Sequence, residues 1–211
     1  MFITFEGPEG SGKTSAANEV IKILIARGYD VLYTREPGGT PIAEEIRSII
    51  LDKKNTALDA RAEALLYAAS RRQHLVEKVW PALKEGKIVI SDRFLDSSLA
   101  YQGAARKIGI DNVLNINLFA TEGTFPDLTL LFDITPEKGL ERIAINKKRE
   151  VNRLDLEALE FHRMVRETFL ELAEKYRDRY VIIDASKTLP EVVSVALNAI
   201  IDRLEQKHAR L

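Results

Sequence analysis

The chain has 211 residues, of which 45% are hydrophobic and 30% are charged, as expected for a globular protein with one well-packed core. Its 31 basic and 32 acidic side chains nearly cancel, so the composition gives no support to a nucleic acid or an anionic membrane as a partner. The absence of cysteine excludes disulfides, thiolate metal sites and cysteine nucleophiles. We find no signal peptide and no apolar run near the roughly 20 residues that span a bilayer, and we therefore expect a cytoplasmic protein.

The first predicted elements are a strand, a glycine-rich turn and a helix. Residues 2–5 are short, aromatic and β-branched, as in a strand, and the helix has an apolar face made of Val20, Ile21, Leu24 and Ile25. Residues 7–14 lie between them and match Gly-x-x-x-x-Gly-Lys-[Ser/Thr], the P-loop that binds nucleotide phosphates. The residues that we expect to bind the phosphates of a nucleoside triphosphate are Gly7, Pro8, Glu9, Gly10, Ser11, Gly12, Lys13 and Thr14.

A P-loop binds phosphate because it gathers positive charge. The turn points backbone N–H groups at the phosphates, and the positive end of the helix dipole adds to them. In this motif the Lys13 ammonium reaches the β- and γ-phosphates, and the Thr14 hydroxyl holds Mg²⁺.

Strand-like and helix-like segments alternate along the rest of the chain, and no linker divides it. Four further strands are predicted, at residues 31–34, 87–91, 127–134 and 180–183. Helices are predicted at about residues 59–83 with a kink or break at Pro81, from Thr135 onward, and at roughly 190–207. We therefore predict a single α/β domain over residues 1–211, with a five-stranded parallel sheet and helices on both faces.

Ligands of such a sheet bind beyond the carboxyl ends of its strands, where three informative loops should meet. The P-loop follows the first strand, residues 35–40 follow the second, and Asp92 and Arg93 follow the third. Asp92 could bind Mg²⁺, its water shell or an arginine, and Arg93 could neutralise charge that develops near the γ-phosphate.

Further polar side chains suit the recognition of a nucleobase and a sugar. Ser98, Tyr101 and Gln102 offer hydroxyl and amide groups, although a helix cap and a packing aromatic ring would explain the first two equally. Tyr67 and Arg71 are four residues apart on one helix face, so they could sandwich and hydrogen-bond a flat base. Ordinary packing on a helix surface is the alternative for this pair.

Two basic features suit phosphate binding. Arg35 and Arg47 could bind an acceptor phosphate, although Arg47 could also lie on a solvated helix face. Residues 142–153 contain a basic cluster between two predicted helices, which could close over the phosphates as a lid or remain a solvated loop.

Taken together, these segments resemble thymidylate kinase, the P-loop enzyme that phosphorylates dTMP. The similarity extends from the first strand to residues 184–185, and its specific parts are the P-loop and residues 34–39, 68–71, 92–93, 97–102 and 125–129. The resemblance implies the fold of a nucleoside monophosphate kinase. It also implies transfer of the γ-phosphoryl group of ATP to dTMP, giving dTDP and ADP for dTTP synthesis, with Mg²⁺ as cofactor and a homodimer as the assembly.

The resemblance also assigns roles in acceptor binding. It implies that Arg71 hydrogen-bonds thymine, that Ser98 and Gln102 face the base edge, and that Tyr101 lies against the deoxyribose and disfavours a 2′-hydroxyl. Tyr67 occupies the base-stacking position, where the family usually has phenylalanine.

Roles in phosphate binding follow in the same way. Arg47 and Arg93 correspond to arginines that hold the acceptor phosphate, with Arg35 beside them. Glu36 corresponds to a glutamate that helps position the acceptor or Mg²⁺, so Thr14, Asp92 and Glu36 are the candidate metal-binding residues.

The P-loop has no basic residue before its lysine, whereas the lid segment is basic. The chain is therefore similar to the bacterial lid-arginine subtype, and Arg149 is our candidate for the catalytic lid residue, with Arg142 and Arg153 as neighbouring candidates.

Other P-loop classes fit the sequence less well. Another nucleoside or nucleotide kinase would differ at the base-reading positions. A regulatory GTPase usually has Asn-Lys-x-Asp, but residues 146–149 read Asn-Lys-Lys-Arg. A motor or remodelling ATPase expects an apolar strand that ends in Asp-Glu, and here arginine follows the acid. A plain nucleotide-binding module would bind ATP without transferring phosphate to a monophosphate.

Overall fold

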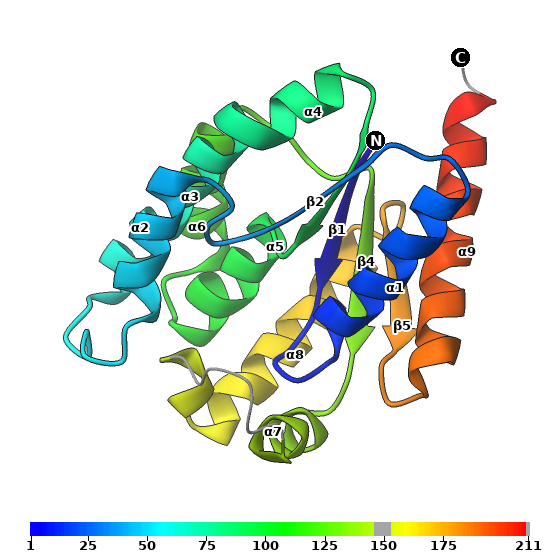
Figure 1. The fold of residues 1–211 in the computed structure, drawn as a ribbon. Helices are drawn as coiled ribbons and strands as arrows, with labels where there is room; N and C mark the ends of the chain where they lie inside the picture. The colour runs from blue at the N-terminus through cyan, green and yellow to red at the C-terminus, as the bar shows by residue number, and fades with distance from the viewer. Residues whose placement is uncertain (146–152, 210–211) are drawn as a thin grey trace.

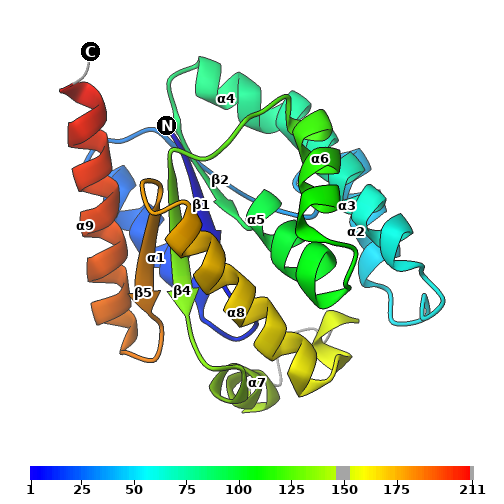
Figure 2. The ribbon, with the colours of Figure 1, turned by 180° about the vertical axis from the view of Figure 1, so that it is seen from behind.

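The computed structural model describes residues 1–145 and 153–209, which form a parallel sheet with helices on both sides (Figure 1 and Figure 2). Its strands are β1 (Phe2–Glu6), β2 (Val31–Arg35), β3 (Ile88–Asp92), β4 (Leu128–Asp133) and β5 (Tyr180–Asp184). They pair in parallel in the order β2-β3-β1-β4-β5. The predicted five-stranded parallel sheet is therefore confirmed, and each strand lies within about one residue of its predicted bounds.

The helices follow the alternating pattern. They are α1 (Lys13–Ala26), α2 (Pro41–Leu51), α3 (Ala60–His74), α4 (Trp80–Lys84), α5 (Leu95–Ser98), α6 (Ile110–Thr121), α7 (Pro136–Ile145), α8 (Leu159–Lys175) and α9 (Leu189–His208), with π-helical turns η1 (Leu75–Val79) and η2 (Leu99–Ala105) and a 3₁₀ turn η3 (Leu154–Leu156). The long helical region predicted near residues 59–83 is α3, η1 and α4 in succession. Pro81 lies in the first turn of α4, where a missing N–H costs little. No helix in the described ranges is long and apolar enough to cross a membrane.

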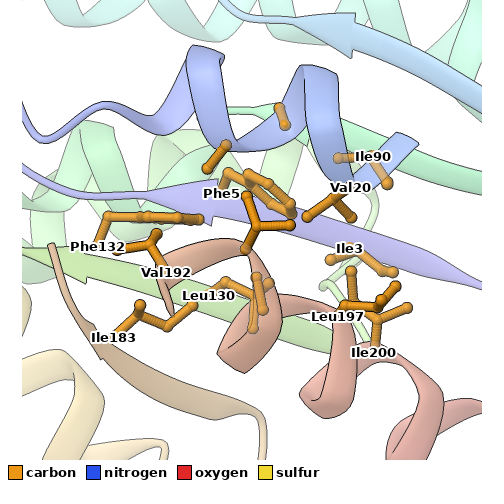
Figure 3. Close-up of a cluster of buried hydrophobic side chains, with 14 of the residues drawn as sticks. Ile3, Phe5, Val20, Ile90, Leu130, Phe132, Ile183, Val192, Leu197 and Ile200 are labelled. Atoms are coloured by element: carbon orange, nitrogen blue, oxygen red, sulfur yellow. The ribbon is translucent and has the colours of Figure 1, made fainter. Parts of the chain in front are cut away.

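Alternation of side chains along each strand divides the core in two. Ile3 and Phe5 of β1 pack under α1 and α9, in the cluster that Figure 3 shows, whereas Phe2 packs on the opposite face with α8 and η2. Figure 1 and Figure 2 show these two helical layers from opposite sides. A strand covered on both faces needs few polar residues, which explains the mostly apolar sequence of β4.

The predicted apolar face of α1 is only partly correct. Val20 and Leu24 are fully buried against the sheet, and Ile21 is half-buried, but Ile25 is 55% exposed. Successive residues of an α-helix are about 100° apart, so a residue directly after a core position turns away from the sheet. The stripe instead continues backward to Ala16 and Ala17.

The register of the sheet brings the functional loops together. Asp92 at the end of β3 pairs with Phe5 of β1 on one side and with Arg35 of β2 on the other. The P-loop, the loop after β2 and the loop after β3 therefore start from the same edge of the sheet, as predicted for ligand binding at the carboxyl ends of parallel strands.

Candidate active site

The P-loop lies between β1 and α1 and wraps around the ammonium group of Lys13. The Nζ atom donates hydrogen bonds to the carbonyl oxygens of Gly7 at 2.9 Å and Pro8 at 3.0 Å, and to Ser11 Oγ at 3.1 Å. Burial, and to a smaller extent the positive charge of Arg93, lowers the pKa of Lys13 to about 8. A bound phosphate would supply the negative charge that this buried ammonium group needs.

Close backbone contacts fix the shape of the turn. A Cβ at Gly7 would lie 2.4 Å from the carbonyl oxygen of Phe132, and a Cβ at Gly10 would lie 2.0 Å from that of Gly139. Both glycines have positive φ angles, 144° and 70°, which other residues rarely adopt. The P-loop thus packs backbone to backbone against α7, the helix that leads into the predicted lid.

Thr14 and Asp92, two of the three predicted metal-binding residues, contact each other beside this turn. Thr14 Oγ1 donates to Asp92 Oδ2 at 2.8 Å, and the Tyr33 hydroxyl approaches the same oxygen at 3.4 Å. Hydroxyl and carboxylate oxygens fit Mg²⁺, which usually takes one or two protein ligands and completes its shell with phosphate and water. Within residues 1–145 and 153–209, no group of three or more His, Cys, Asp or Glu side chains forms a metal site of its own.

Glu36 has a different environment from the other predicted metal ligands. Its side chain is buried, with Oε2 accepting from Arg71 Nε at 2.7 Å and Oε1 paired with His74 Nδ1 at 2.9 Å. His74 Nε2 in turn contacts Thr34 Oγ1 at 2.7 Å. Both carboxylate oxygens are therefore engaged by side chains, and the predicted role of Glu36 in positioning the acceptor or Mg²⁺ stays a prediction.

The predicted base-reading residues gather behind Tyr67. Tyr67 lines the cleft, and one helical turn further along α3 the guanidinium of Arg71 donates to Ser98 Oγ at 3.1 Å and to Asn117 Oδ1. Arg71, Ser98 and Gln102 are each at most 2% exposed and come from α3, α5 and η2. Burial, followed by the charge of Glu63, raises the pKa of Tyr67.

Arg93 and Tyr101 converge on a carboxylate of the P-loop itself. Arg93 donates to Glu9 Oε1 at 2.6 Å and to Ser97 Oγ at 3.0 Å, and the Tyr101 hydroxyl donates to the same glutamate oxygen at 3.1 Å. The guanidinium also lies over the Tyr101 ring, 4.9 Å from its centre. Sequence reasoning placed Glu9 only in the phosphate-binding turn and missed that its side chain joins the P-loop to Arg93 and Tyr101.

Beneath this layer is a buried carboxyl group that the sequence analysis also missed. Glu6 ends β1 and accepts from the Phe94 N–H at 2.7 Å and from Ser97 Oγ at 2.5 Å. Burial, then the nearby charge of Asp96, raises its pKa to about 8. Asp96 is itself held by two hydrogen bonds from Arg179, at 2.7 and 2.8 Å. The sequence feature that could have predicted this buried carboxyl group is the position of Glu6 at the end of an apolar strand.

The predicted phosphate-binding arginines, Arg35 and Arg47, line the same cleft as the P-loop. Arg35 and Arg47 both donate to the carbonyl oxygen of Pro37, at 3.0 and 2.9 Å, and Arg35 also pairs with Glu44 at 3.0 Å. The cleft has a volume of about 1090 Å³ and extends from the P-loop past Asp92 to these arginines.

The lid candidates have separate positions. Arg142 lines the cleft and donates to the carbonyl oxygen of Ala185 at 2.9 Å. Arg153 donates to the Ile50 carbonyl at 3.1 Å and pairs with Glu63. Arg149 lies outside the described residues, so its predicted role stays a prediction.

A parallel sheet with a P-loop at its carboxyl edge, joined by one cleft to a second set of arginines, defines a P-loop kinase of the nucleoside monophosphate kinase type. Residues 5–195 match the family model of thymidylate kinase. The chain belongs to the thymidylate kinase family.

Individual relatives agree with this assignment. A thymidylate kinase of Geobacillus sp. (strain WCH70) is 59% identical over 204 residues, which is 97% of this chain and 97% of the relative. A thymidylate kinase of Clostridium novyi (strain NT) is 60% identical over 191 residues, or 90% of this chain and 93% of the relative. The crystal structure of thymidylate kinase from Ehrlichia chaffeensis superposes with a TM-score of 0.74 at 32% identity, covering 95% of this chain and 98% of that one.

Proposed function

We propose that the cleft binds ATP and dTMP end to end, with the P-loop holding the donor and the Tyr67 side holding the acceptor. The enzyme transfers the γ-phosphoryl group of ATP to dTMP, which gives dTDP and ADP in the synthesis of dTTP. The observation that carries the site assignment is the continuous cleft between the P-loop and the arginines at Arg35 and Arg47.

On the donor side, the backbone N–H groups of the P-loop and the start of α1 surround the phosphates of ATP. Three hydrogen bonds keep the Lys13 ammonium group inside the loop, and it exchanges some of these partners for phosphate oxygens when ATP binds. Thr14 and Asp92 would hold Mg²⁺, whose charge offsets that of the phosphate oxygens when it is bound.

Phosphoryl transfer passes through a loose transition state with charge spread over the equatorial oxygens. Arg93 is placed by Glu9 and Ser97 next to the P-loop, where it can neutralise this charge. The acceptor oxygen belongs to a phosphate that is already an anion, so no side chain has to remove a proton from it. The lid supplies the remaining positive charge, and Arg149 stays our candidate for this role.

On the acceptor side, Tyr67 stacks on thymine, Arg71 hydrogen-bonds it, and Ser98 and Gln102 face its edge. Tyr101 is fixed by its hydrogen bond to Glu9 and lies against the deoxyribose.

Three further residues complete the proposed acceptor site. Arg47, with Arg35 beside it, binds the acceptor phosphate from the far wall of the cleft. Glu36 holds the guanidinium of Arg71 in place from behind.

A homodimer is also part of the proposal, as is a cytoplasmic location, where ATP is available. Phe119 of α6 is 89% exposed and Leu65 of α3 is 56% exposed, on two helices that pack against each other. Large exposed apolar side chains on adjacent helices favour a protein contact. Phe119→Asp should therefore shift the chain from dimer to monomer in sedimentation analysis, and an unchanged mass would place the contact elsewhere.

The substrate assignment is tested by an ATP-consumption screen against dTMP, dUMP, UMP, CMP, AMP and GMP. We expect dTMP to be preferred and dUMP to be weaker, because one methyl group in an apolar pocket is worth about 1–3 kcal/mol. UMP should be weaker still, because Tyr101 leaves little room for a 2′-hydroxyl. Preference for CMP or AMP would contradict the acceptor assignment.

The lid assignment is tested by single-turnover phosphoryl transfer with separate alanine variants of Arg142, Arg149 and Arg153. Loss of a charge that acts in the transition state should lower kcat strongly and change the dissociation constants of ATP and dTMP little. A large loss at one of the other two arginines and none at Arg149 would reject our candidate and retain the lid. No loss at any position would reduce the cluster to a solvated loop.

A further inference from the structure

Glu63 is a charged residue that is fully buried in the first turn of α3. Its Oε1 accepts a hydrogen bond from Gln102 Nε2 at 2.8 Å and lies 3.5 Å from Arg106 Nε, and its Oε2 pairs with Arg153. A buried carboxylate is costly unless it is paired, and two guanidinium groups offset that cost here. The third partner of Glu63 is the uncharged amide of Gln102, and this hydrogen bond indicates a function for the buried carboxylate.

The position of Glu63 on α3 connects it to the acceptor side of the cleft. Glu63, Tyr67 and Arg71 are four residues apart, so they lie on the same face of the helix, and all three are buried. Glu63 approaches Gln102 from the same face that carries the proposed stacking and hydrogen-bonding residues. Gln102 is 1% exposed, so its amide is held by its protein neighbours and not by bulk water.

The chemistry of this hydrogen bond fixes the orientation of the amide. A carboxylate can only accept hydrogen bonds, so the atom of Gln102 that faces Glu63 is the NH₂ nitrogen. The carbonyl oxygen, Oε1, is consequently the group that Gln102 presents to a base bound beside it.

We propose that Glu63 is a specificity-determining positioning residue, which turns the amide of Gln102 so that an oxygen acceptor faces the acceptor base. This inference rests on the proposed base-facing role of Gln102. Thymine and uracil carry an N3–H donor on the edge between their carbonyl groups, whereas cytosine has an acceptor nitrogen at N3. A fixed oxygen accepts a hydrogen bond from the N3–H of thymine or uracil, but it repels the acceptor N3 of cytosine. A buried polar group that faces the wrong partner lowers affinity.

The surrounding charges indicate what Glu63→Gln would do. Arg153 is a donor only and pairs with Oε2, so it would keep the single side-chain oxygen left at position 63, while Arg106 would keep its pair with Glu157. The new NH₂ group would then face Gln102 and attract its oxygen. The amide of Gln102 would turn over and present NH₂ to the base, the wrong partner for N3–H and a suitable one for the cytosine nitrogen.

The test compares dTMP with 5-methyl-dCMP, which keeps the methyl group and changes the polarity of the edge. We would measure the dissociation constant of dTMP by calorimetry and the inhibition constant of 5-methyl-dCMP against dTMP phosphorylation. Glu63→Gln should lower the preference for dTMP at least about tenfold, the worth of one good hydrogen bond, with the dissociation constant of ATP unchanged. Glu157→Gln is the matched control, because Glu157 pairs with Arg106 at 2.5 Å, whereas the amide of Gln102 donates to Glu63.

A double variant keeps the proposal testable if Glu63→Gln disturbs folding. Glu63→Gln combined with Gln102→Glu exchanges the amide and the carboxylate, preserves net charge, and again presents an oxygen to the base. It should restore the preference for dTMP. Equal loss of affinity for both nucleotides in Glu63→Gln, or an unchanged preference in a folded variant, would overturn the proposal. If Gln102→Ala leaves the preference unchanged, the base-facing role itself fails; if Gln102→Ala lowers it and Glu63→Gln does not, only the positioning role fails.

Discussion

Lys13 should take up a proton when ATP binds, because its pKa in the free enzyme is about 8. Burial within the P-loop is the main cause of the low pKa, and the charge of Arg93 adds to it. The triphosphate brings several negative charges within contact of the ammonium group and raises its pKa well above 8. At pH 8, about half of the free enzyme molecules carry neutral Lys13, so binding should take up about 0.5 proton per ATP.

The same linkage sets the pH dependence of affinity. Proton uptake means that ATP binding weakens as pH rises, and with a pKa of about 8 the affinity should fall about fivefold between pH 8 and pH 9. Uptake should shrink to about 0.1 proton at pH 7 and grow to about 0.9 proton at pH 9.

Isothermal titration calorimetry in two buffers of different ionisation enthalpy measures this uptake directly. Lys13→Arg is the control, because arginine stays protonated throughout this range. Glu6, whose pKa is also about 8, is retained in both proteins and cancels in the comparison. Equal uptake at pH 8 by the wild type and by a folded Lys13→Arg variant would refute the assignment of the proton to Lys13.

Three further predictions address binding and stability. Arg71→Ala should raise the KM for dTMP and leave the KM for ATP nearly unchanged; an unchanged KM for dTMP would contradict the base-reading role. Gly139→Ala places a Cβ 2.3 Å from the carbonyl oxygen of Glu9, so urea denaturation should show a loss of about 1–3 kcal/mol, together with weaker ATP binding. Full stability would show that α7 can move away from the P-loop. Arg179→Ala leaves the carboxylate of Asp96 buried and should cost about 3–5 kcal/mol in the same assay; a loss below about 1 kcal/mol would mean that water replaces the guanidinium.

The sheet and the P-loop could be predicted because their signals are local. Each strand is a short apolar run between polar turns, and the phosphate-binding turn has a fixed pattern of glycines before Lys13 and Thr14. The order β2-β3-β1-β4-β5 could not be read in the same way, because pairing joins segments that are far apart in the sequence. Ile25 shows a similar limit, since a neighbouring apolar residue can face the core or the solvent.

The supporting residues were harder to predict than the residues they support. Tyr67 and Arg71 were recognised from their residue types and resemblance, but Glu63 and His74 are equally buried on the same helix and were not. Their spacing of three or four residues along α3 placed them on the right face. The sequence does not show that this face is buried, because a charged residue ordinarily indicates a solvent-exposed position. Only the packing of α3 against η2 and α6 shows that the face is an interior one.

The contact between Gly10 and Gly139 also limits how this enzyme can change by mutation. In the apolar core of Figure 3, a larger side chain at one position can be accommodated by a smaller one at its neighbour, because the contacts are made by side chains. Where the P-loop meets α7, each side of the contact is already the smallest residue, and the opposing atoms are backbone. A substitution at either glycine therefore has no partner that can shrink in compensation, so second-site suppressors of such a change should arise from shifts of α7 as a whole and not from repacking at the contact.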